Sequence, residues 1–419
     1  MSPLRSAGLA GHVATTAHVQ AAYPFMAETG LGPHGPYIGR DIYGGAFCYD
    51  PFHLYQQGAL TNPNCLVIGQ VGRGKSALLK TYLLRQIVFG RQAWIVDIKG
   101  EYAPLARALG IEPIRLEPRG RVTLNPLTPK GGPQRQLDLV GSIAAAALAR
   151  PLQPVERTAL HTALKTATET AKGREVTLPD LVHALLHPDG RIAADLAMTP
   201  VQALDATREL ALALRELCSG ALAGMFDSPT TPGLNLDAPM VVLDLSAVLT
   251  ASPVALAVLM ACATAWLRAT IDQEPAGEGH QRIVVVDEAW RVLSSLGVGE
   301  WLQQSFKLSR GLGVQNVVVM HRLTDLEATG AAGSREVRLA EGLLADTETK
   351  VIYAQPQDQI PRTRELLGLT DTEASLLPTL GRGWALWKVG RRSFLAQHRL
   401  TPLEHALVNT DQKMTEAPR

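Results

Sequence analysis

The octapeptide Gly69–Ser76, with the sequence GQVGRGKS, constrains the fold of this chain more than any other segment. It matches GxxxxGK[ST], a pattern whose glycines let a loop turn its backbone N–H groups inward around a phosphate chain without Cβ clashes. An apolar run, Cys65–Ile68, precedes it, and Lys75–Phe89, with an apolar face at helical spacing, begins inside it. A strand, a glycine-rich loop and a helix in this order predict a phosphate-binding P-loop.

The residue types in the loop predict a separate task for each part. The backbone N–H groups and the helix start would hold the phosphates, and Lys75 would act catalytically between the β- and γ-phosphates of ATP. The Ser76 hydroxyl would bind Mg²⁺. The predicted nucleotide-binding residues of this segment are Gly69, Gln70, Val71, Gly72, Arg73, Gly74, Lys75, Ser76 and Ala77. The alternative, a glycine-rich turn without a ligand, is disfavoured by the flanking strand and helix.

A second acidic motif ends the segment Gln281–Trp290, which reads QRIVVVDEAW. A carboxylate at the end of a strand beside the P-loop strand would hold the water shell of Mg²⁺, which is the role predicted for Asp287. Glu288 would then orient and deprotonate the attacking water. The alternative is an ordinary acidic strand end. The adjacent Asp-Glu pair predicts hydrolysis rather than phosphate transfer, because a simple P-loop kinase must keep an activated water out.

Strand and helix signals alternate along most of the chain, and 46% of its residues are apolar. This order predicts an α/β fold with a mainly parallel sheet covered on both faces. The expected strands are Cys65–Ile68, Gln92–Asp97, Ile111–Leu116, Met240–Leu245, Arg282–Val286, Val314–Met320 and Lys350–Tyr353, with two short edge strands, Trp384–Val389 and Ser393–Leu400. The expected helices are Lys75–Phe89, Pro253–Ile271, Gly299–Gly311 and Val337–Leu344.

The composition along the chain predicts four regions. Residues 1–62, rich in glycine and proline, are expected to be an irregular N-terminal lead-in, with short strands at Tyr37–Gly39 and Ala46–Tyr49. Residues 63–132 and 235–405 form the α/β domain, and residues 133–234, rich in alanine and leucine, form an all-helical insertion. Residues 406–419 are expected to be a flexible tail.

Charge, cysteines and hydropathy limit the classes of function. A net charge of +1 gives no basic field, which argues against a protein that coats DNA. The four cysteines are scattered and no signal peptide is evident, which fits a reducing cytoplasm. The uncharged stretch Leu245–Leu267 contains an apolar helix of about 15 residues, shorter than the ~20 that a membrane span needs. We therefore expect a buried helix and no integral membrane span.

Several motifs come in an order that resembles a known group. These are Asp97–Tyr102 (DIKGEY), Asn125–Leu127 (NPL), the helical insertion and Asp287–Trp290 (DEAW). Together they resemble the conjugal-transfer ATPases of type IV secretion systems, of the VirB/TraC type within the HerA/FtsK superfamily of P-loop motors. The similarity is greatest to the short form found in Gram-positive conjugative elements and covers roughly residues 35–405.

The resemblance implies a RecA-like ATPase domain that works as a homo-hexamer, with ATP held between neighbouring subunits. The ring would be cytoplasmic and peripheral at the inner face of the cell membrane, docked on membrane secretion-channel proteins. Its transported substrate would be DNA or a DNA–protein complex. By position, Asp97, Lys99 and Glu101 would border the nucleotide pocket; the alternative is an exposed turn with a local ion pair.

The chain departs from the pattern of this group at two places. Members are often longer, with an N-terminal domain that contacts the channel, whereas little chain precedes the motor here. A glutamine that senses the γ-phosphate usually follows the strand after the Asp-Glu motif, and here His321 stands there. His321 would donate the same hydrogen bond, or it is an ordinary loop histidine. Arg310 and Arg322 are candidates for the arginine that reaches a neighbour's γ-phosphate.

Three functions are compatible with these motifs. The first is an ATP-hydrolysing motor that drives substrate transfer or channel assembly in conjugative or type IV secretion. The second is a DNA-pumping translocase or coupling protein, disfavoured by the near-neutral charge and the lack of membrane anchors. The third is a nucleotide-dependent assembly scaffold that binds ATP and turns it over slowly.

Overall fold

The computed structural model describes residues 30–127, 133–148, 150–188, 190–220, 222–248, 259–260, 262, 281–289, 303, 306–307, 309–323 and 335–408. Eleven strands within these ranges form one sheet, in the order β2-β1-β11-β10-β9-β3-β8-β7-β4-β6-β5. They are β1 (Tyr37–Asp41), β2 (Ala46–Cys48), β3 (Cys65–Ile68), β4 (Gln92–Asp97), β5 (Ile114–Arg115), β6 (Met240–Asp244), β7 (Arg282–Val286), β8 (Val314–Met320), β9 (Thr349–Ile352), β10 (Trp384–Val389) and β11 (Arg392–His398).

The sheet has a parallel part and an antiparallel edge. All pairings from β9 through β3, β8, β7, β4 and β6 to β5 are parallel, whereas β10, β11, β1 and β2 continue the sheet with antiparallel pairs. Every residue of β3, β4, β6, β7 and β8 is buried. Such continuous burial requires cover on both faces, as in α/β proteins. The predicted α/β fold with a mainly parallel sheet is confirmed.

The strand register in the parallel part of the sheet places the carboxyl ends of β3, β4, β7 and β8 at one edge. Ile68, the last residue of β3, pairs with Met320 at the end of β8. Val286, the last residue of β7, pairs with Val318 of β8 and with Val96 of β4. The segments that follow β3, β4, β7 and β8 therefore meet at the carboxyl edge of the sheet, where α/β proteins place their ligands.

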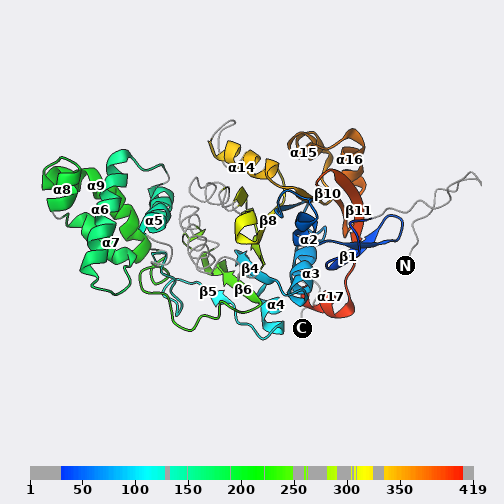
Figure 1. Cartoon of the computed structure of the whole chain (residues 1–419), viewed down its shortest axis with the longest axis horizontal. Coiled ribbons are helices and arrows are strands. Elements are labelled where there is room, and N and C mark those ends of the chain that lie inside the picture. Colours follow the sequence, from blue (N-terminus) through cyan, green and yellow to red (C-terminus); the bar gives the residue numbers. More distant parts are fainter. Residues whose placement is uncertain are drawn as a thin grey trace, which may run out of the picture.

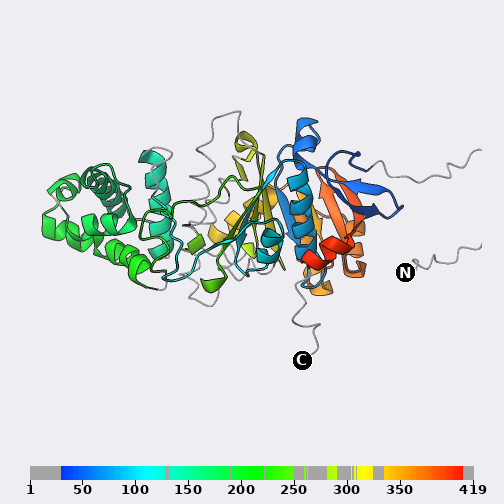
Figure 2. The same cartoon turned by 90° about the horizontal axis from the view of Figure 1, so that it is seen from below.

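Two hydrophobic clusters, one on each face, result from the alternation of side chains along the strands. Cys65 and Val67 point to the face covered by α2 (Pro51–Gln56), α3 (Lys75–Val88) and α4 (Ala103–Ala108). Leu66 and Ile68 point to the other face, where α14 (Arg335–Ala345), α15 (Ile360–Leu367) and α16 (Asp371–Leu376) pack. A last helix, α17 (Pro402–Val408), lies against α3 and α4 (Figure 2).

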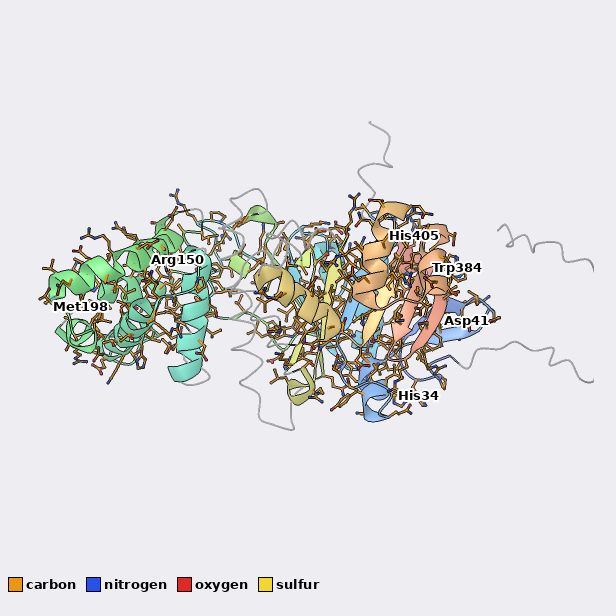
Figure 3. All side chains as sticks on the ribbon, turned by 90° about the horizontal axis from the view of Figure 1, so that it is seen from above. His34, Asp41, Arg150, Met198, Trp384 and His405 are labelled. Carbon is orange, nitrogen blue, oxygen red and sulfur yellow. The ribbon has the colours of Figure 1, made fainter. Side chains whose placement is uncertain are left out.

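Five helices lie together at one end of the molecule, beyond β5, and the β1–β2 hairpin lies at the other end (Figure 1). They are α5 (Pro133–Leu148), α6 (Pro154–Thr170), α7 (Leu178–Leu186), α8 (Gly190–Asp195) and α9 (Pro200–Ser219), and we call them the helical lobe. Arg150 and Met198 mark this lobe in Figure 3, whereas Trp384 and His405 lie toward the other end of the molecule. Capping boxes begin α6, α7 and α9, which explains why the chain starts a new helix at each of these points.

Several expectations need correction. The two short strands expected within residues 1–62 are present as β1 and β2, but this range also contains helix α2, which was not predicted. Asp50 starts α2 by accepting hydrogen bonds from the backbone N–H groups of Phe52 and His53, with Pro51 at the first helical position. The expected strand Ile111–Leu116 is reduced to the two residues of β5, since Pro113 cannot donate a hydrogen bond to a ladder.

The end of the chain and the segment between β9 and β10 also differ from the prediction. Residues 406–408, expected to belong to a flexible tail, form the last turn of α17. Helices α15 and α16 stand between β9 and β10, where no helix was predicted. Most of the expected helices Pro253–Ile271 and Gly299–Gly311 lies outside the described residues. Among the helices that are described, none has the length and hydropathy to cross a membrane.

Candidate nucleotide-binding site

The loop between β3 and α3 depends on its glycines. Gly69, Gly72 and Gly74 have φ angles of 152°, 77° and 112°, in the region that residues with a Cβ rarely adopt. A Cβ on Gly69 would also clash with the Cβ of Tyr353 in the strand end beside it. The loop can therefore bend over the carboxyl edge of the sheet, so that the N-terminus of α3 points into the space that the loop encloses.

Lys75, the first residue of α3, lies beneath the loop. It is 5% exposed, and its ammonium donates hydrogen bonds to the carbonyl oxygens of Gly69 and Gln70, the latter at 2.9 Å. Burial lowers the pKa of Lys75 to about 8, although the carboxylates of Asp287 and Glu288 oppose this shift. A cation held by carbonyl oxygens is suited to exchange them for phosphate oxygens.

Asp287 and Glu288 follow β7 directly and are 5% and 4% exposed. Burial, together with the neighbouring Glu288, raises the pKa of Asp287 to about 6, although Lys99 opposes this shift. One carboxylate oxygen of Asp287 accepts a hydrogen bond of 2.9 Å from the backbone N–H of Glu288. This bond fixes the two acids relative to each other.

Glu288 is held in an unusual conformation. Its φ is 52°, in the left-handed region that costs a non-glycine residue about 1–3 kcal/mol and that is found mainly at functional sites. Its Oε1 forms an ion pair with Lys99 and a hydrogen bond of 2.6 Å with Nε2 of His321. Burial alone would raise the pKa of Glu288, but the hydrogen bonds from His321 and Lys99 lower it to about 2. Glu288 is therefore a carboxylate at neutral pH.

The turn after β4 is organised by Asp97. This residue is fully buried, and its carboxylate accepts hydrogen bonds from the backbone N–H groups of Lys99, Gly100 and Tyr102 at 2.8–3.1 Å. The structure thus places Asp97 behind the pocket wall rather than on it. Its contacts present Lys99 and Glu101 to the pocket.

A cavity of about 310 Å³ lies between the loop and this turn. Its lining includes the loop residues Val71, Gly72, Gly74, Lys75, Ser76 and Ala77, together with Lys99, Glu101 and His321. A second hollow, of about 550 Å³, also adjoins the loop and is lined by Gln70, Arg73, His321, Arg322 and Arg382, among others. The structure therefore assembles most of the residues that the sequence analysis selected.

The predicted catalytic residues His321 and Arg310 lie at opposite ends of β8. His321 follows β8, contacts Glu288 and lines both cavities, so it stands between the acidic pair and the loop. Arg310 is exposed and precedes β8, at the edge of the sheet opposite the loop. Arg310 is thus not part of the site formed by its own chain, and its action on a neighbouring subunit remains a prediction.

Sequence reasoning missed Arg382 and the residues near the end of the described chain. Arg382 lies in the turn before β10 and lines both cavities. The backbone N–H of the next residue, Gly383, donates a hydrogen bond of 3.0 Å to the carbonyl oxygen of Arg73. The tripeptide Gly381-Arg382-Gly383 was a signal, since flanking glycines mark a turn that can approach another backbone closely. Leu400, His405 and Val408 also line the first cavity.

The parallel sheet, the glycine loop at its carboxyl edge and the buried acidic pair define a P-loop nucleotide-binding protein with a RecA-like core. No protein-family model matches the sequence, and no curated protein matches it. Solved structures do match. VirB4 of Thermoanaerobacter pseudethanolicus aligns with 90% of this chain and 99% of its own, at 22% identity and a TM-score of 0.73.

The plasmid coupling protein TrwB is also similar. Its complex with ADP and Mg²⁺ aligns with 88% of this chain and 91% of its own, at 15% identity and a TM-score of 0.61. Its unbound form aligns with 81% of this chain and 85% of its own, at 16% identity and a TM-score of 0.59. The likeness to conjugation ATPases that the motifs predicted is confirmed at the level of the fold.

Proposed function

We propose that this chain is the ATP-hydrolysing motor of a conjugative or type IV secretion system. The observation that carries the proposal is the position of Glu288. It is a buried, ionised carboxylate in a strained conformation, and Lys99 and His321 hold it beside the P-loop. A site that only binds nucleotide has no need to maintain such a group. The VirB4-like fold over 90% of the chain supports the secretion role.

The residues present fit ATP and Mg²⁺. Gly72 has open space around it, and Gly74 begins α3 in a left-handed conformation, so phosphate oxygens can approach the loop backbone closely. Ser76 lines the cavity, and the Asp287 carboxylate is buried at the end of β7. A hydroxyl and a carboxylate are the oxygen donors that Mg²⁺ prefers. When bound, Mg²⁺ supplies positive charge against the β- and γ-phosphates.

Hydrolysis then follows from the roles of the chain's own side chains. Lys75 exchanges its carbonyl partners for phosphate oxygens, and Glu288 orients a water in line with the γ-phosphate. The water oxygen forms the new bond to phosphorus, the bond to the ADP oxygen breaks, and Glu288 accepts the proton. Lys99 and His321 keep Glu288 ionised and in place, and His321, which lines both cavities beside the loop, would sense the γ-phosphate.

The proposed assembly is a homo-hexamer with ATP at its subunit interfaces, placed in the cytoplasm at the inner face of the membrane. Its partners would be membrane secretion-channel proteins, and its cargo DNA or a DNA–protein complex. A coupling protein or DNA-pumping translocase is the second candidate, supported by the likeness to TrwB at a TM-score of 0.61. Under that candidate, double-stranded DNA should stimulate the ATPase several-fold, whereas the secretion motor needs no such stimulation.

Glu288→Gln tests the proposal. The amide cannot accept the proton, so we expect the steady-state ATPase rate to fall by about 100-fold or more while ATP binding is retained. Lys75→Ala is the matched control, because it should abolish ATP binding itself. Unchanged hydrolysis in Glu288→Gln would rule out the catalytic assignment. If the unsubstituted protein hydrolyses ATP only slowly, at the same rate as Glu288→Gln, the third candidate, an assembly scaffold, is favoured.

A further inference from the structure

We propose that the segment Leu400–Val408 forms the wall that binds the adenine ring of ATP, with the ring packed on His405 between Leu400 and Val408. This inference rests on the proposed function and adds the part of the site that recognises the base. No motif in the sequence indicated it, because residues 400–408 lie more than 300 positions from the P-loop.

The cavity is continuous from the phosphate loop to this segment. Gly72, Lys75 and Ser76 line one part of it, and Leu400, His405 and Val408 line another part of the same space. Its volume of about 310 Å³ lies at the lower end of the range typical of small-molecule sites. A nucleotide whose phosphates lie in the loop needs room for its ribose and base, and this end of the cavity offers that room.

The lining of the cavity combines two kinds of surface. The loop end offers backbone N–H groups, the ammonium of Lys75 and the hydroxyl of Ser76, which suit a triphosphate. The other end offers two aliphatic side chains and an imidazole ring. A planar heteroaromatic ring is bound by such surfaces, because apolar side chains exclude water from its faces and an aromatic ring stacks on it.

The wall is fixed to the helix that begins at the loop. Glu404 of α17 accepts two hydrogen bonds, of 2.7 and 2.8 Å, from the guanidinium of Arg85 on α3. Arg85 also donates a hydrogen bond of 2.7 Å to the carbonyl oxygen of Arg399. Nε2 of His398 lies 2.8 Å from the hydroxyl of Thr81, also on α3. These bonds attach the proposed base wall to α3, the helix that follows the phosphate loop.

His405 is the residue to change, since its side chain is exposed on α17 and its removal should leave the fold intact. We expect His405→Ala to weaken ATP binding about tenfold, the loss typical of one base–aromatic stack. Binding of Mg²⁺-tripolyphosphate, which has phosphates and no base, should change by less than about twofold. His405→Phe should restore ATP binding, because the phenyl ring stacks without the imidazole nitrogens. Leu403→Ala, on the same helix but outside the cavity lining, should bind both ligands normally.

Competition titrations with ATP and with tripolyphosphate separate the outcomes. Normal ATP binding by His405→Ala would overturn the base wall. An equal loss for both ligands would overturn it too, because α17 would then act only by supporting the loop. Lys75→Ala should lose both ligands. If ATP binds as described but is not hydrolysed, the proposed motor function fails while the base wall stands.

Discussion

Lys75 and Asp287 titrate on either side of neutrality in the free protein. Burial lowers the pKa of Lys75 to about 8 and raises the pKa of Asp287 to about 6. Below pH 6, Asp287 becomes protonated and can no longer hold Mg²⁺; above pH 8, Lys75 loses the proton that gives it charge. The value of kcat/KM for Mg²⁺-ATP should therefore be greatest between these values, since it reports groups of the free enzyme. Initial rates at saturating Mg²⁺ from pH 5 to 9 would measure this, and a flat profile would contradict it.

His321 occupies the position where a glutamine is expected. Its Nε2 contacts Glu288, and a glutamine amide offers the same kind of donor. We expect His321→Gln to keep the ATPase rate within about fivefold, whereas His321→Ala should lower it by about tenfold or more. Steady-state rates at saturating ATP would compare the two variants. If His321→Ala and His321→Gln had equal ATPase rates, His321 would be an ordinary loop residue.

At the residue scale, local patterns were readable from the sequence and distant contacts were not. The loop and the Asp-Glu pair each lie within ten residues and follow a strand, so pattern and context were enough to find them. The role of Asp97 required knowing that its carboxylate is buried among backbone N–H groups. Arg382 precedes β10 and His405 follows β11, so their positions beside the cavity depend on where these two antiparallel strands join the sheet. No local pattern predicts that placement.

A buried ion pair with Arg85 helps to hold helix α17, and this makes the stability of the helix depend on pH. Glu404 is 6% exposed, and although burial opposes the shift, Arg85 holds its pKa at about 2. The folded pKa is depressed, so the stabilisation is present above the usual value of about 4.5 and is lost as the pH falls toward 2. Glu404→Ala should lower the free energy of unfolding by about 2 kcal/mol at pH 7.

Denaturant titrations at pH 7 and pH 3 would test this. The difference between the unsubstituted protein and Glu404→Ala should shrink at pH 3, because the unfolded chain, with a pKa of about 4.5 at Glu404, then binds a proton that the folded chain, with a pKa of about 2, largely does not. Leu403→Ala, at an exposed neighbouring position, serves as the control and should change little at either pH. A difference that is independent of pH would show that packing, not charge, fixes α17.

At the element scale, strands were predicted better than short helices. The apolar runs of β3, β4, β7 and β8 are continuous because both faces of the parallel sheet are covered. Helices α2, α15 and α16 have six to eight residues, which is too few for a helical period to stand out. Their beginnings depend on caps such as Asp50 and Thr370, which also occur in turns.

The place of Arg310 leads to a prediction about the whole assembly. Because Arg310 lies at the sheet edge opposite its own loop, it can complete a site only in a neighbouring subunit. Glu288→Gln and Arg310→Ala should each lack activity, while an equimolar mixture that reassembles at random should regain about one quarter of it. In such a mixture, that fraction of interfaces combines an intact Glu288 with an intact neighbouring arginine. Full activity of Arg310→Ala alone would exclude this role.

The hydrophobic cluster on the α14 face of the sheet continues without a break into the helical lobe. Leu124 and Leu127, which follow β5, belong to the same cluster as Ile68 beside the loop and Leu160 within α6. Close-packed interiors deform little, so strain at one end is passed on rather than absorbed. In mechanical terms, the helical lobe is a stiff extension of the sheet rather than a loosely tethered domain. A displacement of β3 during a catalytic cycle should therefore move the far end of the helical lobe as well.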